Sequence, residues 1–299
     1  MSYVLVLIAG ISWGLIGIFT KAIDALGFTE MQMLFVKGVL ATALLFFLTF
    51  LKDRSQLRLK HWKDIRYFIG TGICSFTFFS WAYMKAINLT SLGVAAVLLY
   101  TAPTFVMLFS VLLFHEKMTK TKALVLGMTF LGCVLVTGLL EGGAAFTWQG
   151  ILVGLASGVG YALYSIFGPY AIKAGYGSLG ISFYTFLTAT VFMCFCVEPV
   201  TIFREITEME QWPLAVSFAL LTTVLPYLCY TKGLSGLPAS QASVTATIEP
   251  VVAALLGILI FHESASVWKI AGILLVLSSV VLMNRQGETK KTDEQESLS

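Results

Sequence analysis

The sequence predicts an all-α polytopic membrane protein with ten transmembrane helices, and two observations support this prediction. Of the 299 residues, 58% are hydrophobic and 12% are charged, and the mean hydropathy is +0.87. Soluble domains carry about 25% charged residues, so this composition excludes a water-soluble globule. The charges also lie between apolar runs of around 20 residues, the length that a helix needs to cross a hydrocarbon core of roughly 30 Å.

Each apolar run predicts one helix, because the runs are about twice as long as the strands of a membrane β-barrel and lack their alternation. In chain order the runs cover 3–22, 31–51, 65–87, 92–114, 121–140, 148–172, 178–200, 212–232, 238–261 and 267–284. Residues 285–299 are polar and charged, which is typical of a disordered tail.

The distribution of Lys and Arg predicts that both termini are cytoplasmic. With ten spans the termini share one side, and the loops and tail on that side contain 14 Lys and Arg residues against 4 on the other. The expected location is a cell membrane, most simply a bacterial cytoplasmic membrane. A net charge of +3 without a basic patch argues against nucleic acid. The expected partners are the lipid bilayer and a small-molecule solute, and the protein is expected to be a monomer or a homodimer.

An internal duplication divides the chain into a first unit, 1–140, and a second unit, 148–284. A shift of 147 places Pro103 on Pro250, and the tripeptide ending at Glu116 on the one ending at Glu263. Each unit has five spans, an odd number, so the second unit must enter the bilayer from the opposite side. Inverted repeats favour a substrate site near the midplane and alternating access. A duplicated scaffold without a transport role is the alternative.

The repeated features together resemble the EamA family of the drug/metabolite transporter superfamily. They are Thr101-Ala102-Pro103 and Ile248-Glu249-Pro250 within the fourth span of each unit, and the Phe-His-Glu endings at 114–116 and 261–263. The resemblance covers about residues 3–284. It implies ten spans, a central cavity and movement of metabolites such as amino acids, often outward. Family members frequently carry Arg in the second span, where this sequence has Lys37, a point charge instead of a planar fork.

Glu249 and Lys37 are the first candidates for substrate binding or coupling. A charge near the bilayer centre costs roughly 2.5–3.5 kcal/mol on insertion scales, so a charge that persists there needs a reason. The repeat aligns Glu249 with Ala102, and Lys37 with Thr185, so the shared fold requires neither charge. For Glu249 the interpretations are a proton acceptor, a contact to a substrate cation, or a structural hydrogen bond. For Lys37 they are a solute contact, snorkelling, or an ion pair with Glu249.

A polar stripe and an aromatic group supply the remaining candidates. Gln241, Thr245 and Glu249 recur at i, i+4 and i+8, a face that must meet protein or water; a polar seam between helices is the alternative. Tyr161 and Tyr164, with Trp13 at the matching place in the first span, suggest an aromatic cavity wall. Packing or lipid contact is the alternative for these rings.

Pro103 and Pro250 are candidate hinges, because each removes a backbone N–H and frees the carbonyl four residues earlier. A static kink is the alternative. The Phe-His-Glu endings lack the HExxH spacing of a metal site, so we expect polar contacts at helix ends and no metal.

These observations predict a secondary transporter of small metabolites, an amino acid or related solute, with export as the expected direction and alternating access as the mechanism. Proton coupling is left open. The sequence has no Walker A motif for ATP, no GxSxG motif and no paired catalytic groups in the spans, so we expect neither an enzyme nor a cofactor. A channel or uncoupled facilitator is the main alternative, ahead of a membrane enzyme or a receptor.

Overall fold

Every regular element in the described part of the chain is helical. The computed structural model describes residues 1–24, 29–137, 139, 147–199, 202 and 212–296. In the first unit the α-helices are α1 (Ser2–Gly14), α2 (Ile16–Asp24), α3 (Glu30–Lys52), α4 (Ile65–Ile69), α5 (Phe78–Leu89), α6 (Leu92–Leu99), α7 (Ala102–Phe114) and α8 (Lys120–Val136), with a π-helical segment, η3 (Gly70–Thr77), between α4 and α5.

The second unit has the same kinds of element. They are α9 (Trp148–Lys173), α10 (Ser178–Met193), α12 (Trp212–Ala219), the π-helical segment η4 (Leu220–Val224), α13 (Leu225–Leu234), α14 (Ala239–Ala246), α15 (Ile248–Phe261) and α16 (Val267–Glu296). Short 3₁₀ turns, Arg54–Leu57 and Trp62–Asp64, lie between α3 and α4.

Seven helical stretches among the described residues are long and apolar enough to cross a membrane. They are Ser2–Thr20, Met31–Lys52, Leu92–Phe114, Trp148–Lys173, Trp212–Leu234, Ala239–Phe261 and Val267–Arg285. The chain is therefore a polytopic helical membrane protein. The other three predicted runs are helical but shorter or interrupted: η3 divides 65–87, α8 has 17 residues and α10 has 16. The predicted ends of two of these runs, at residues 140 and 200, lie outside the described residues.

The polar tail differs from its prediction as far as the structure describes it. The helix α16 continues to Glu296, whereas disorder is expected from residue 285. Adding a residue to an existing helix is much less costly than starting one, and Glu, Lys and Gln, which are common in this segment, are good helix formers. Residues 297–299 lie outside the described part.

Two interruptions of helix geometry recur 147 positions apart. One lies at Tyr100 and Thr101 between α6 and α7, and the other at Thr247 between α14 and α15. Pro103 and Pro250 stand in the first turn after these breaks. Proline is tolerated there because the first N–H groups of a helix have no intrahelical partner. The prolines therefore begin new helices and do not kink continuous ones.

The Phe-His-Glu endings terminate α7 and α15 in the same way. His115 and His262 adopt the left-handed conformation, with φ of 55° and 53°. The next amide, that of Glu116 or Glu263, bonds back to the carbonyl of Ser110 or Gly257 at 3.1 Å, as in a Schellman cap. The duplicated motif is thus a helix C-cap followed by an acidic residue.

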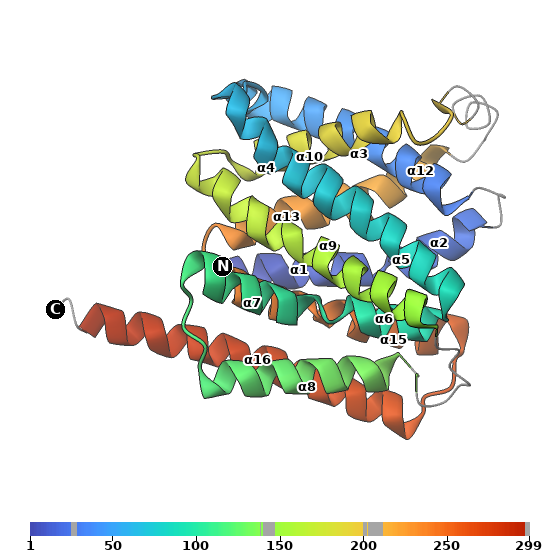
Figure 1. Cartoon of the computed structure of the whole chain (residues 1–299), viewed down its shortest axis with the longest axis vertical. Helices are drawn as coiled ribbons and strands as arrows, with labels where there is room; N and C mark the ends of the chain where they lie inside the picture. Colours follow the sequence, from blue (N-terminus) through green and yellow to red (C-terminus); the bar gives the residue numbers. More distant parts are fainter. Residues whose placement is uncertain (25–28, 138, 140–146, 200–201, 203–211, 297–299) are drawn as a thin grey trace.

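The two units are interlocked. Figure 1 shows the start of α1 and the far part of α16 at the same end of the bundle, which we call the terminal end; the last turn of α2, the end of α5 and the start of α16 lie at the other, the distal end. The helix α1 of the first unit packs against α13, α14 and α15, while α9 of the second unit packs against α5, α6 and α7. The pair α8 and α16 lies side by side at one edge (Figure 1).

Candidate functional site

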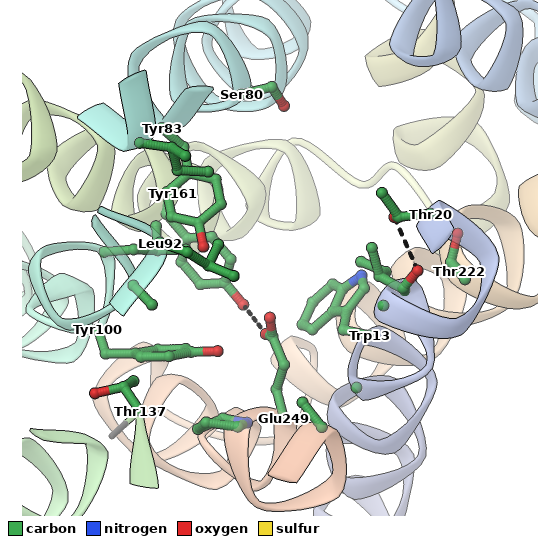
Figure 2. Close-up of a pocket in the computed structure, with 18 of the residues that line it drawn as sticks. Trp13, Thr20, Ser80, Tyr83, Leu92, Tyr100, Thr137, Tyr161, Thr222 and Glu249 are labelled. Carbon is green, nitrogen blue, oxygen red and sulfur yellow. Dashed lines mark hydrogen bonds between the residues drawn. The ribbon is translucent and has the colours of Figure 1, made fainter. Parts of the chain in front are cut away.

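A cavity of about 620 Å³ lies between the two units. Figure 2 labels eight of its polar and charged lining residues: Thr20, Ser80, Tyr83, Tyr100, Thr137, Tyr161, Thr222 and Glu249. Lys37 and Tyr227 line the cavity as well. The lining also includes Ile87, Leu92 and Lys269, which lie where helices start or end at the distal end. The cavity thus extends from the middle of the bundle toward the distal end.

Glu249 is held at the cavity wall by the helix break before it. It is the second residue of α15, where the unpaired N–H groups and the helix dipole favour a negative charge. The Tyr161 hydroxyl donates a hydrogen bond to Glu249 Oε2 at 3.3 Å. Figure 2 shows the Tyr100 hydroxyl pointing toward the same carboxyl group and Trp13 on its other side. The carboxylate therefore faces the cavity between aromatic side chains.

Small residues of α1 allow this arrangement. A Cβ atom on Gly14 would lie 2.6 Å from Val252 Cβ and 3.0 Å from the Glu249 carbonyl oxygen, and one on Gly10 would lie 2.9 Å from the Ala246 oxygen. The spacing of these two glycines is the small-xxx-small pattern of close helix packing, and here it places α1 against the broken helix.

The second unit repeats the contact. A Cβ atom on Gly158 of α9 would lie 3.0 Å from the Leu98 oxygen, beside the other break. Each break is therefore packed against a small-residue face from the opposite unit.

Lys37 of α3 lines the same cavity, and its ammonium group lies over two aromatic rings. The Nζ atom is 5.0 Å from the Phe218 ring centroid and 5.8 Å from that of Phe76, within the range of cation–π attraction. The ion pairs among the described residues do not include Lys37, so the hypothesised pair with Glu249 does not form here. Tyrosine hydroxyls surround the carboxylate, while the ammonium group rests on phenyl rings.

Two of the three aromatic residues proposed as a cavity wall line the cavity, and the third does not. Trp13 and Tyr161 line the cavity, with ring centroids 6.1 Å apart in an edge-to-face arrangement. Tyr164 lies outside the lining; its hydroxyl is 2.6 Å from Thr231 Oγ1, and the side chain is buried against α13. Residues three positions apart differ by about 60° around a helix, and here that offset turns Tyr164 toward α13 and away from the cavity.

The polar stripe of the ninth run is divided. Gln241 accepts a hydrogen bond from the Tyr3 hydroxyl at 2.8 Å, and Thr245 Oγ1 lies 3.4 Å from Asn284 Oδ1. Both residues are outside the cavity lining and hold helices together, as the polar-seam interpretation expects. The i, i+4, i+8 register assumes a continuous helix, and the break at Thr247 turns Glu249 to a different face.

Tyr100 is the main lining residue that sequence reasoning missed. It stands immediately before Thr101-Ala102-Pro103, so the same proline signal that marks the break could have identified it. Phe76 and Tyr227 were missed as well, because an apolar or aromatic residue in a span is indistinguishable by sequence from one that packs in the core. Pro250 lines the cavity and Pro103 does not.

Within the described residues, no group of three or more His, Cys, Asp and Glu side chains is placed to hold a metal ion. What the site offers is two carboxylates, Glu249 and Glu263, two ammonium groups, Lys37 and Lys269, several hydroxyls and aromatic faces in a membrane-embedded cavity that both units line. An arrangement of this kind defines a membrane transporter, with a small solute as its cargo.

Comparison with known proteins agrees with this class. A model of the EamA-like transporter family matches residues 1–138 and again 148–285. The chain belongs to this family and is a multi-pass cell-membrane protein.

Relatives with similar sequences are also described as transporters. An uncharacterized transporter of Archaeoglobus fulgidus is 28% identical over 72% of this chain and 76% of its own length. The uncharacterized transporter YxxF of Bacillus subtilis is 25% identical over 96% of this chain and 91% of its own length. A solved crystal structure matches with a TM-score of 0.77 at 18% identity, over 94% of this chain and 95% of the other, which supports the fold.

Proposed function

We propose that this protein is a secondary transporter that exports small metabolites, amino acids or related solutes, by alternating access between its units 1–140 and 148–284. The observation that carries the proposal is the shared cavity, in which Glu249 and Lys37 face the same space from different units. A zwitterionic solute can bind its ammonium group to the carboxylate and its carboxylate to the lysine. The aromatic walls favour a solute that also has apolar surface.

The proposed topology has ten spans with the terminal end in the cytoplasm, as the excess of Lys and Arg on that side supports. The cavity then extends toward the outside. At the terminal end the units contact each other, for example through Tyr3 with Gln241 at 2.8 Å and the backbone N–H of Lys60 with the Tyr176 hydroxyl at 2.7 Å, and these residues lie outside the cavity lining. A cavity that extends toward one end of the bundle supports alternating access over an open channel.

Proton coupling follows if one carboxylate serves two cations in turn. A solute ammonium group and a proton compete for Glu249, so a proton that binds from the outside displaces the solute there. An uncoupled facilitator would use Glu249 for binding only, and its transport would not respond to a pH gradient.

The test is uptake and exchange in proteoliposomes, with solutes chosen by comparing metabolites in the medium of cells that overproduce or lack the protein. Glu249→Gln should abolish transport or uncouple it from pH while the protein stays folded in the membrane. Thr245→Val, a change in the same predicted span outside the cavity, serves as the control and should keep the wild-type pH dependence. Wild-type rate and pH dependence in Glu249→Gln would contradict the role of Glu249, and a chain that moves no solute would contradict the proposed function.

A further inference from the structure

The glutamate of each Phe-His-Glu ending forms an ion pair with a lysine six residues further along the chain. Lys122 Nζ lies 2.8 Å from Glu116 Oε2, and Lys269 Nζ lies 3.1 Å from Glu263 Oε2. The two pairs are 147 positions apart, so they are equivalent in the repeat. The first pair lies at the terminal end of the bundle and the second at the distal end.

The surroundings of the two equivalent pairs differ. Ser240 of α14, in the other unit, donates a short hydrogen bond to Glu116 Oε2, and Lys122 Nζ is 3.3 Å from the Ser240 hydroxyl. The residue equivalent to Ser240 is Gly93, which has no side chain to offer. Gly93 and Lys269 both line the cavity, as does Glu263. The Glu116 side chain is 14% exposed and that of Glu263 is 46% exposed.

Apolar contacts show the same difference. Met107, Val125, Val244 and Met283 form a buried cluster that joins α7 and α8 to α14 and α16. At the distal end the equivalent of Met107 is Ala254 and that of Met283 is Val136, and both of these line the cavity. Two members of the buried terminal cluster thus have equivalents at the cavity wall, where Val136 and Ala254 also pack against other apolar residues.

We propose that the two Glu–Lys pairs are the two gates of the transport path, and that the Ser240 hydroxyl is the latch of the terminal gate. In this structure the terminal gate is closed on Ser240 and the distal gate is open. Closure of the distal gate brings Glu263 and Lys269 onto α6 at Gly93, which lacks the hydroxyl that Ser240 offers at the equivalent position. The latch on one side only favours the state that is open at the distal end.

This inference rests on the proposed alternating access. It predicts the effect of adding a hydroxyl at Gly93 and of removing the hydroxyl at Ser240. Gly93→Ser supplies the missing hydroxyl, and Gly93→Ala adds the same Cβ atom without it. A Cβ atom at this position would lie 3.4 Å from the Thr137 carbonyl oxygen, an ordinary contact, so both substitutions are accommodated. Ser240→Ala removes the existing hydroxyl.

The experiment measures thiol alkylation without any solute. In a background without the five native cysteines, a single reporter is placed at Val244→Cys in the terminal cluster or at Ala254→Cys in the cavity, and N-ethylmaleimide is added to the purified protein. The Ala254→Cys thiol should react quickly and the Val244→Cys thiol slowly. Ser240→Ala should speed the Val244→Cys reaction about tenfold, the effect of losing a hydrogen bond to a charged group.

Gly93→Ser should slow the reaction of the Ala254→Cys thiol and speed that of the distant Val244→Cys thiol, whereas Gly93→Ala should change neither rate. Glu116→Gln, a second variant at the terminal gate, should act like Ser240→Ala; size-exclusion profiles check that each variant is folded. Unchanged rates in Ser240→Ala and Glu116→Gln, or equal effects of Gly93→Ser and Gly93→Ala, would overturn the proposal. The alkylation reaction contains no solute, so its result is independent of the transport assay. The gate proposal can be contradicted while transport in proteoliposomes is observed, and transport can be absent while the alkylation rates change as predicted.

Discussion

Tyr161 of α9 donates a hydrogen bond from its phenol hydroxyl to the carboxylate of Glu249 in α15, at 3.3 Å. The helix α9 begins the second unit, and α15 follows the helix break of that unit. The contact belongs to the cavity wall, and the Tyr161 ring also packs edge-to-face on Phe79, with centroids 5.4 Å apart. The hydroxyl and the ring can therefore be tested separately.

Tyr161→Phe should weaken solute binding about tenfold, because it removes one hydrogen bond to a charged group and keeps the ring packing. Binding is measured by competition against a transported solute in proteoliposomes. Tyr164→Phe is the matched control: it removes a buried hydroxyl that bonds Thr231 outside the cavity, so it should lower stability and leave solute affinity unchanged. Equal losses of affinity in both variants would contradict a specific role for Tyr161.

Lys37→Met should abolish the transport of solutes that carry a carboxylate and spare amines that lack one. Methionine keeps most of the unbranched side chain near Phe76 and Phe218 but removes the positive charge that a solute carboxylate would bind. Lys37→Arg keeps the charge and should retain part of the activity. Uptake of a paired set, an amino acid and its decarboxylated amine, provides the measurement. If neither solute is affected, Lys37 has no contact with the cargo.

Gly14→Ala should destabilise the protein by about 1–3 kcal/mol, the usual cost of overpacking a filled contact. The added methyl group would come within 2.6 Å of Val252 Cβ and force α1 away from α15. Gly17→Ala is the control one turn further along, because nothing lies within 4 Å of its added Cβ atom. Thermal unfolding in detergent compares the two, and a midpoint for Gly14→Ala as high as that for Gly17→Ala would refute the close packing of α1.

Much of the membrane architecture could be predicted from composition alone, since the cost of an unpaired charge or backbone group in hydrocarbon leaves few alternatives to long apolar helices. The repeat could be read from the sequence as well: the breaks at Tyr100 and Thr247 each lie just before a proline, and the two prolines stand at equivalent positions of the repeat. Glu249 and Lys37, the two charges without an equivalent in the repeat, both line the cavity.

The contacts of the polar and aromatic candidates were less predictable. Gln241 and Thr245 were grouped with Glu249 by assuming one continuous helix, and the break before Glu249 separates them. Tyr164 was grouped with Tyr161 by its helical spacing, but it packs on Thr231. Periodicity describes one helix at a time, and it contains no information about which neighbour covers each face.

The sequence by itself determined the class of protein, the duplication and the two charges that its fold does not need, because hydropathy, spacing and alignment are properties of the chain read in order. Only the tertiary structure decided toward which end of the bundle the cavity extends. The Glu116 and Glu263 ion pairs are equivalent in sequence, yet one carboxylate meets the Ser240 hydroxyl and the other faces the cavity near Gly93. That difference depends on contacts between units more than a hundred residues apart, and such contacts exist only in a particular packing of the two units.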